Sequence, residues 1–172
     1  MSKRSISDGF RRILYDAMVL SASLRVIREC SYYRRWKAAD IDGSVEAHQA
    51  NALLQIRSMI DFLTCHGRTE HDTMTVVQFF GCAKQAITFP ERKAANKYAA
   101  HKSWDAVAKD AAAGARQLRK PEIVKLGMTV LDGFFAFWKE CDRHLTISLN
   151  PYATRYKVIL EENVNELKRL GA

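Results

Sequence analysis

The chain has 172 residues, of which 48% are hydrophobic and 27% are charged. This length fits one domain with a single hydrophobic core, and the composition excludes a disordered chain. No uncharged stretch approaches the about 20 apolar residues that a membrane span needs, and the first residues lack the apolar run of a secretory signal. We therefore expect one cytoplasmic domain over residues 1–172.

The net charge of +8 gives the chain an attraction for anionic partners, nucleic acids among them. Basic residues accumulate between Arg11 and Lys37 and again between Lys84 and Lys125. Arg34 and Arg35 stand among Tyr32, Tyr33 and Trp36, a combination suited to phosphate contact and base stacking. The alternative is a solvated helix face, in which long basic side chains cover apolar surface.

The first half of the chain predicts two helices. Asp8 is a plausible cap for a helix that runs to about Lys37, and the segment AADIDGS (38–44) then indicates a break, with Ser44 as a second cap. A second helix follows from Val45 to Cys65. Both helices carry apolar residues at steps of three and four, which predicts that one side of each faces a core. These residues are Ile13, Ala17, Leu20, Leu24 and Ile27 in the first helix, and Leu53, Ile56, Ile60 and Leu63 in the second.

The second half predicts three more helices. Residues 68–89 favour a loop with a short helix, although TVVQFF could also form a strand. Pro90 opens an alanine-rich third helix that Pro121 ends. The fourth, residues 122–145, is the most hydrophobic, and we expect it at the centre of the fold. Asn150 and Pro151 open a last helix that ends before Gly171. The fold predicted is all-α, an up-and-down bundle of about five helices.

Two groups of polar residues lie beside these apolar stripes. Arg57 and Asp61 are four residues apart in the second helix and can pair. In the third helix Lys97 and His101 share a stripe that also holds Asp105, with Trp104 beside it. Asn96 lies about 140° round the helix from His101, because each residue turns about 100°.

If the second and third helices face each other, Arg57, Asp61, Asn96 and His101 can converge on one polar pocket. An imidazole near a carboxylate can act as general base or acid, and a guanidinium can bind phosphate. Those groups suffice for metal-free RNA cleavage, in which a base activates the ribose 2′-hydroxyl. The alternative is a hydrogen-bonded network that joins two helices without chemistry.

The runs QIRSMIDFL, VVQFF and NKYAAHKSWD together resemble a group of bacterial helical proteins, which is in turn similar to the HEPN superfamily. The resemblance covers about residues 45–110. It implies a helical bundle, and for many members a toxin or phage-defence ribonuclease with a site near a dimer interface. The family pattern is an arginine, four to six residues and then a histidine, which here is His101.

The positions that would carry the family arginine are Ala94, Ala95 and Asn96, so the pattern is incomplete. Two hypotheses follow. In the first, the protein binds or cleaves RNA, with His101 as acid or base, Arg57 and Lys97 at the phosphate, and Asp61 and Asn96 as orienting groups; Trp104, Arg34 and Arg35 add RNA contacts. In the second, it is a catalytically silent module that binds a partner protein in a defence or toxin–antitoxin system.

Metals and cofactors are not expected. The four cysteines lie far apart in the sequence, so we expect them to be reduced thiols. The cluster of Cys65, His66, His71 and Asp72 matches no standard zinc spacing. No glycine-rich phosphate loop occurs. The partners that we expect are RNA, a partner protein or antitoxin, and a second copy of the chain in a homodimer formed by helix packing.

Overall fold

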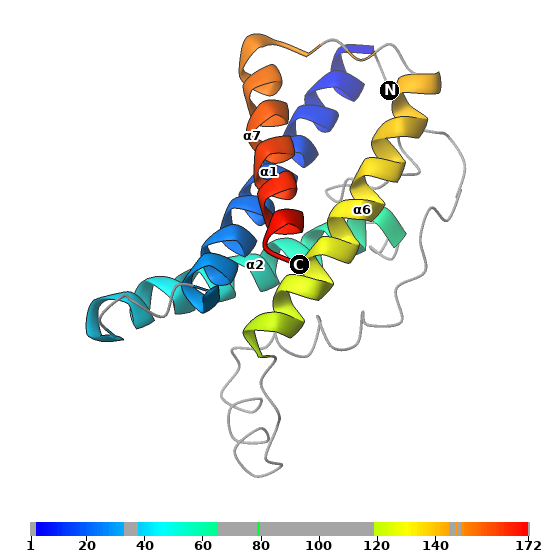
Figure 1. Cartoon of the computed structure of the whole chain (residues 1–172). Coiled ribbons are helices and arrows are strands. Elements are labelled where there is room, and N and C mark those ends of the chain that lie inside the picture. The colour runs from blue at the N-terminus through cyan, green and yellow to red at the C-terminus, as the bar shows by residue number, and fades with distance from the viewer. Residues whose placement is uncertain are drawn as a thin grey trace.

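The computed structural model describes residues 3–32, 38–64, 79, 119–144, 147 and 149–171. Within these residues the structure consists of four helices and no strands (Figure 1). The all-α class is therefore confirmed. The predicted third helix lies outside the described residues, and of the short helix predicted before it only Phe79 is described. None of the described helices has the length and apolarity that crossing a membrane would require.

Helix α1 spans Lys3–Tyr32. It begins before Asp8, so the prediction that Asp8 caps this helix is wrong: its carboxylate instead contacts Arg11, one turn further on. The predicted apolar stripe is confirmed, because every one of its five residues is buried. Together with Phe10 and Leu14 they form the contribution of α1 to the core.

Helix α2 spans Ala38–Thr64, which includes the segment AADIDGS that the sequence marks as a break. That prediction is wrong, since Gly43 and Ser44 have helical backbone. A glycine inside a helix costs only about 1 kcal/mol, which the rest of a 27-residue helix can offset. Ile56, Ile60 and Leu63 are buried as predicted, and Leu53 packs at the edge of the core.

Helix α6 spans Lys120–His144 and places Pro121 in its first turn. The side chain of Glu122 caps its start: the backbone N–H of Arg119 donates to Oε2 of Glu122 over 2.7 Å. The strong apolarity predicted for this helix is confirmed by burial on several sides. The buried residues include Ile123, Val130, Leu131, Phe134, Phe137 and Trp138.

Helix α7 spans Pro151–Arg169, and both of its predicted ends are confirmed. The side chain of Asn150 accepts a hydrogen bond from the Ala153 N–H over 2.8 Å, and Pro151 occupies the first turn. At the other end Gly171 has a φ of 73°, a backbone conformation that L side chains rarely adopt. Local signals were sufficient here because each acts within one turn.

Helix α1 packs extensively against each of the other three, and α2 also packs against α6 (Figure 1). Within the described residues α1, and not α6, is therefore the central helix. Ser23 meets Asn51, and Leu24 meets Gly127, whereas Phe10 near the start of α1 meets Phe137. The early residue Phe10 thus meets the later part of α6 and Leu24 meets its start, so α6 runs antiparallel to α1.

Helix α7, in contrast, runs parallel to α1. Tyr15 contacts Tyr156 with ring centroids 5.3 Å apart, and Arg28, thirteen residues later, reaches Leu170 at the end of α7. Helices α1 and α7 thus start at the same end of the molecule, as Figure 1 shows for the blue and orange helices.

A cluster of aromatic rings fills the core near the start of α1. The ring of Phe10 lies 5.3 Å from Trp138 and 6.1 Å from Phe137. Phe62 of α2 meets Phe137 edge-on at 5.1 Å, and Phe79 meets it at 5.3 Å. Edge-to-face pairs of this kind stabilise a core beyond the area that they bury. The cluster therefore joins α1, α2 and α6 with Phe79, which is buried and has helical backbone.

Candidate functional site

Arg57 and Asp61 lie on the outer side of α2, next to the buried Ile56 and Ile60. Nε of Arg57 is 3.8 Å from Oδ2 of Asp61, and the two side chains are 39% and 27% exposed. The predicted pairing one helical turn apart and the partial burial are both confirmed. An ion pair at this distance and exposure adds little to folding stability, so the guanidinium can reach a ligand from solution without a large loss.

The other residues of the predicted site lie outside the described residues. These are His101, Asn96, Lys97 and Trp104 in the expected third helix, and Arg34 and Arg35 after α1. The structure therefore places two of the eight predicted residues and describes no contact between Arg57 and His101. The convergence of the two helices remains a prediction.

The net charge of +8 is divided unevenly along the chain. Residues 64–118 contain eight Lys and Arg against five Asp and Glu, a net of +3. Residues 31–44 add +1 and residues 1–5 add +2. These three stretches, here called the basic segments, thus carry +6 of the +8, while the remaining residues of the chain carry only +2. An anionic ligand is attracted to the basic segments more than to the remaining residues of the chain.

The described helices contain a polar contact that the sequence analysis missed. Asn163 is buried in α7 and donates from Nδ2 to the hydroxyl of Ser21 over 3.1 Å. Its Oδ1 accepts from Nη1 of Arg25 over 3.3 Å, and Arg25 also donates to Glu29. The signal in the sequence was an amide inside the apolar repeat of Leu160, Val164 and Leu167. The contacts of Asn163 with Ser21 and Arg25 join α7 to α1. The buried amide of Asn163 thus has hydrogen-bond partners within the protein.

A second buried hydroxyl joins α1 to α2. Ser23 is buried and accepts a hydrogen bond of 2.9 Å from Nδ2 of Asn51. Buried hydroxyl and amide groups that have partners orient helices relative to each other, because each misplacement would leave a polar group unsatisfied. The contacts of Ser21 and Ser23 therefore serve to orient α7 and α2 relative to α1.

Burial is the main cause of a shifted pKa in Asp16 and in Cys141. Burial raises the pKa of Asp16, and the nearby Arg12 opposes this effect only in part. Burial, with the carboxylates of Asp142 and Glu140, raises the pKa of the Cys141 thiol to about 12. Because the thiolate is the nucleophilic form, Cys141 is an inert core residue.

Metal-ligating residues do not gather in the part of the chain that the structure describes, where no three His, Cys, Asp or Glu side chains could hold an ion together. The weak cluster of Cys65, His66, His71 and Asp72 lies outside those residues.

Comparisons with known proteins add no family. No family model, curated protein or solved structure matches this chain.

Proposed function

We propose that this protein is an HEPN-like, RNA-directed helical protein that binds RNA through its basic segments. The observation that carries the proposal is the distribution of charge: residues 31–44 and 64–118, which hold Arg34, Arg35, Lys97 and His101, together have a net charge of +4. Phosphates supply most of the affinity of non-specific nucleic-acid binding, so the segments with the highest charge would bind the backbone.

The chemistry proposed for this site is metal-independent cleavage. His101 would take the proton of a ribose 2′-hydroxyl and return one to the leaving 5′-oxygen, and Arg57 or Lys97 would stabilise the charge on the phosphate. Asp61, 3.8 Å from Arg57, would orient the guanidinium. The partial exposure of Arg57 supports this role, because a phosphate can reach it from solution.

RNA binding is tested by removing equal charge from the two parts of the chain. The triple change Lys93→Gln, Lys97→Gln and Lys102→Gln should weaken binding of single-stranded RNA and reduce the slope of log K against log salt by about 2, since each lost phosphate contact removes about 0.7. The matched control changes three exposed lysines outside the basic segments to Gln, namely Lys125, Lys139 and Lys168. Equal losses in the two variants would contradict the proposal.

Cleavage is tested separately by incubating the protein with total RNA in the presence of a chelator. Loss of cleavage in His101→Ala and Arg57→Gln, with cleavage retained in His48→Ala, is the expected result. His48 is a suitable control because it also lies on α2 and is half-buried. Cleavage that persists in His101→Ala would exclude this site.

The two tests together separate the hypotheses. Binding without cleavage leaves an RNA-binding relative without catalysis. If the protein neither binds nor cleaves RNA, the proposal is wrong, and the catalytically silent module that binds a partner protein takes its place.

A further inference from the structure

Helix α1 carries a second pattern on the side away from the core. Arg12, Tyr15, Val19, Ala22, Val26 and Glu29 follow each other at steps of three, four, three, four and three. This is the spacing of the contact positions of a coiled coil. We call these six residues the outer stripe. Its four central members are uncharged, and its two ends carry opposite charges.

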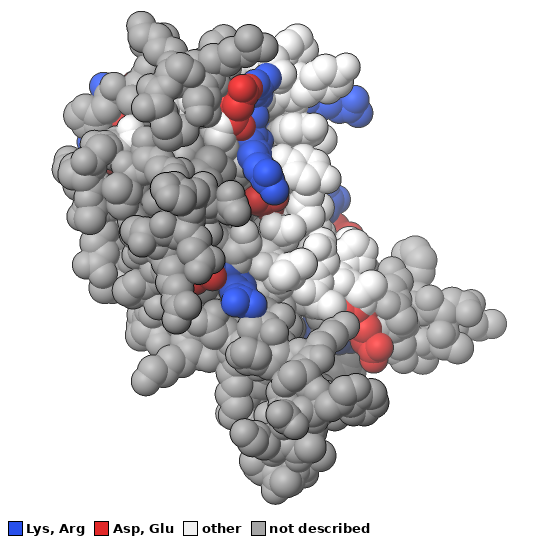
Figure 2. All heavy atoms as spheres, turned by 180° about the vertical axis from the view of Figure 1, so that it is seen from behind, with Lys and Arg blue, Asp and Glu red and all other residues white. Residues whose placement is uncertain are grey.

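The outer stripe is accessible in the structure. Arg12 is exposed, the ring of Tyr15 is 45% exposed, and the other four residues are half-buried. Helix α7 borders the stripe through Tyr156, which meets Tyr15. Tyr152, one turn before Tyr156 on α7, is 71% exposed. Figure 2 shows the molecule from behind relative to Figure 1. On this face uncharged residues form a continuous surface beside a column of charged side chains. Helix α1 thus has two apolar sides: the residues of the core side are buried, whereas those of the outer stripe are half-buried or exposed.

We propose that the outer stripe is the surface on which a second copy of this chain docks, with the two α1 helices antiparallel. The stripe is self-complementary when one helix is reversed about the midpoint between Val19 and Ala22. Tyr15 then lies opposite Val26 of the other copy, and Val19 lies opposite its Ala22. The small Ala22 leaves room for Val19, so the helices can approach closely at the centre.

Charge decides the direction of the pairing. In the antiparallel arrangement Arg12 meets Glu29 of the second copy at both ends of the stripe. In a parallel arrangement Arg12 would meet Arg12 and Glu29 would meet Glu29, and both contacts are repulsive. Glu29 can accept a second donor, because a carboxylate has four acceptor positions and Arg25 occupies one oxygen at 2.6 Å.

The size of the surface sets the strength of the association. The 18 residues from Arg12 to Glu29 span about 27 Å at 1.5 Å per residue. Two helices in contact over this length belong to the smaller class of interfaces, below about 1,200 Å² in total. The dimer should therefore form reversibly as the protein concentration rises. No step of the proposed function is needed for this inference.

The first experiment measures mass by sedimentation velocity over a range of concentrations. The wild-type chain should pass from monomer to dimer, and Ala22→Glu should raise the dissociation constant at least tenfold, because each new carboxylate would be buried opposite Val19 of the other copy. The control is Val158→Glu on α7, where an apolar side chain is 47% exposed and lies outside the stripe. Far-UV circular dichroism shows whether each variant is folded.

The second experiment tests direction and does not depend on a core change. Arg12→Glu and Glu29→Arg should each weaken the dimer, since each places like charges at both ends. An equimolar mixture of the two variants should associate again, because both ends of the mixed dimer then pair Glu with Arg. A wild-type chain that stays monomeric, a dimer that Ala22→Glu leaves unchanged, or a mixture that does not associate would each overturn the proposal.

Discussion

At Gly127 the backbone of α6 leaves room for a side chain of α1. A Cβ atom at this position would lie 2.5 Å from Cδ1 and 2.7 Å from Cδ2 of Leu24, and the Leu24 side chain is fully buried. These separations are well below van der Waals contact, and the surrounding core is closely packed. The absence of a side chain at Gly127 is thus a requirement of the α1–α6 contact.

Gly127→Ala should therefore lower the free energy of unfolding by about 1–3 kcal/mol, the usual cost of overpacking a core. Alanine has a higher helix propensity than glycine, but this difference offsets only about 1 kcal/mol of the cost. Urea unfolding measures the change. In the Leu24→Ala background the same substitution should cost much less, because the clash is gone. A Gly127→Ala variant as stable as the wild type would contradict this account of the contact.

Asp16 shows how burial of a single carboxyl group affects stability. Its pKa is raised mainly by burial and is only partly lowered again by Arg12. A carboxyl group with a raised pKa in the folded state contributes most to stability below its unfolded pKa of about 3.9. That contribution is lost as the pH rises through the folded pKa. At neutral pH the charged Asp16 therefore opposes folding.

Asp16→Asn should raise the melting temperature at pH 7, and the gain over the wild type should shrink as the pH falls toward 3, where both side chains are neutral. Thermal unfolding at several pH values measures the difference. The control is Asp132→Asn, which removes a carboxylate from an exposed position of α6. A gain that is equal at pH 3 and pH 7 would show that the charge is not the cause.

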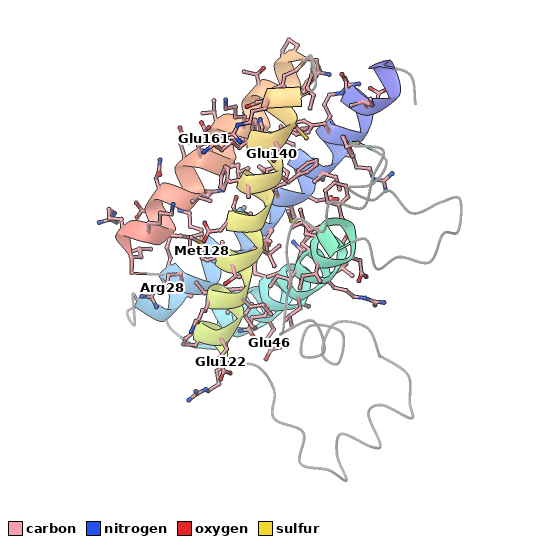
Figure 3. All side chains as sticks on the ribbon, turned by 90° about the vertical axis from the view of Figure 1, so that its right-hand side faces the viewer. Arg28, Glu46, Glu122, Met128, Glu140 and Glu161 are labelled. Carbon is pink, nitrogen blue, oxygen red and sulfur yellow. The ribbon has the colours of Figure 1, made fainter. Side chains whose placement is uncertain are left out.

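At the scale of the helices, Arg28 of α1 holds the end of α7. Its Nε donates to the carbonyl of Leu170 over 3.0 Å, and its Nη2 donates to Leu170 and to Gly171 (Figure 3). Carbonyls in the last turn of a helix have no partner within the helix, and a cation there also interacts favourably with the helix dipole. Arg28 thus supplies from another helix the hydrogen bonds that the end of α7 lacks.

Arg28→Lys should loosen this end although the charge is kept, because an ammonium group cannot reproduce the planar arrangement of donors. We expect faster amide hydrogen exchange over the last turn of α7 and a loss of about 1 kcal/mol in stability. The matched control is Arg143→Lys, where the arginine pairs with Glu140 on the exposed surface of α6. Unchanged exchange at the end of α7 would mean that the dipole interaction alone matters.

The helices also show which signals in the sequence are reliable. Asn150, Pro151 and Gly171 were interpreted correctly because caps act within one turn. The break predicted at 38–44 was wrong, since a single glycine is a weak signal against a long helix. The polar contact of Asn163 with Ser21 could not be predicted, because it depends on a pairing of residues 142 positions apart.

At the scale of the whole molecule, the helical class was predictable from apolar spacing, and the arrangement was not. The most apolar helix, residues 122–145, was expected at the centre, whereas α1 contacts all of the other described helices. Periodicity measures how much of a helix is buried and does not show by what. For the site, spacing predicted the pairing of Arg57 with Asp61; whether His101 approaches them depends on tertiary packing, which no local pattern determines.

The parallel pairing of α1 with α7 has a consequence for the order of folding. Arg28 binds a carbonyl 142 residues further along the chain, and Arg25 binds a side chain 138 residues further along. At a synthesis rate of about 5–20 residues per second, α7 leaves the ribosome roughly 7–28 s after α1. Contacts of such long range also close slowly. A newly made α1 therefore exposes the surface meant for α7 for many seconds, and in that interval the chain is most open to misassembly.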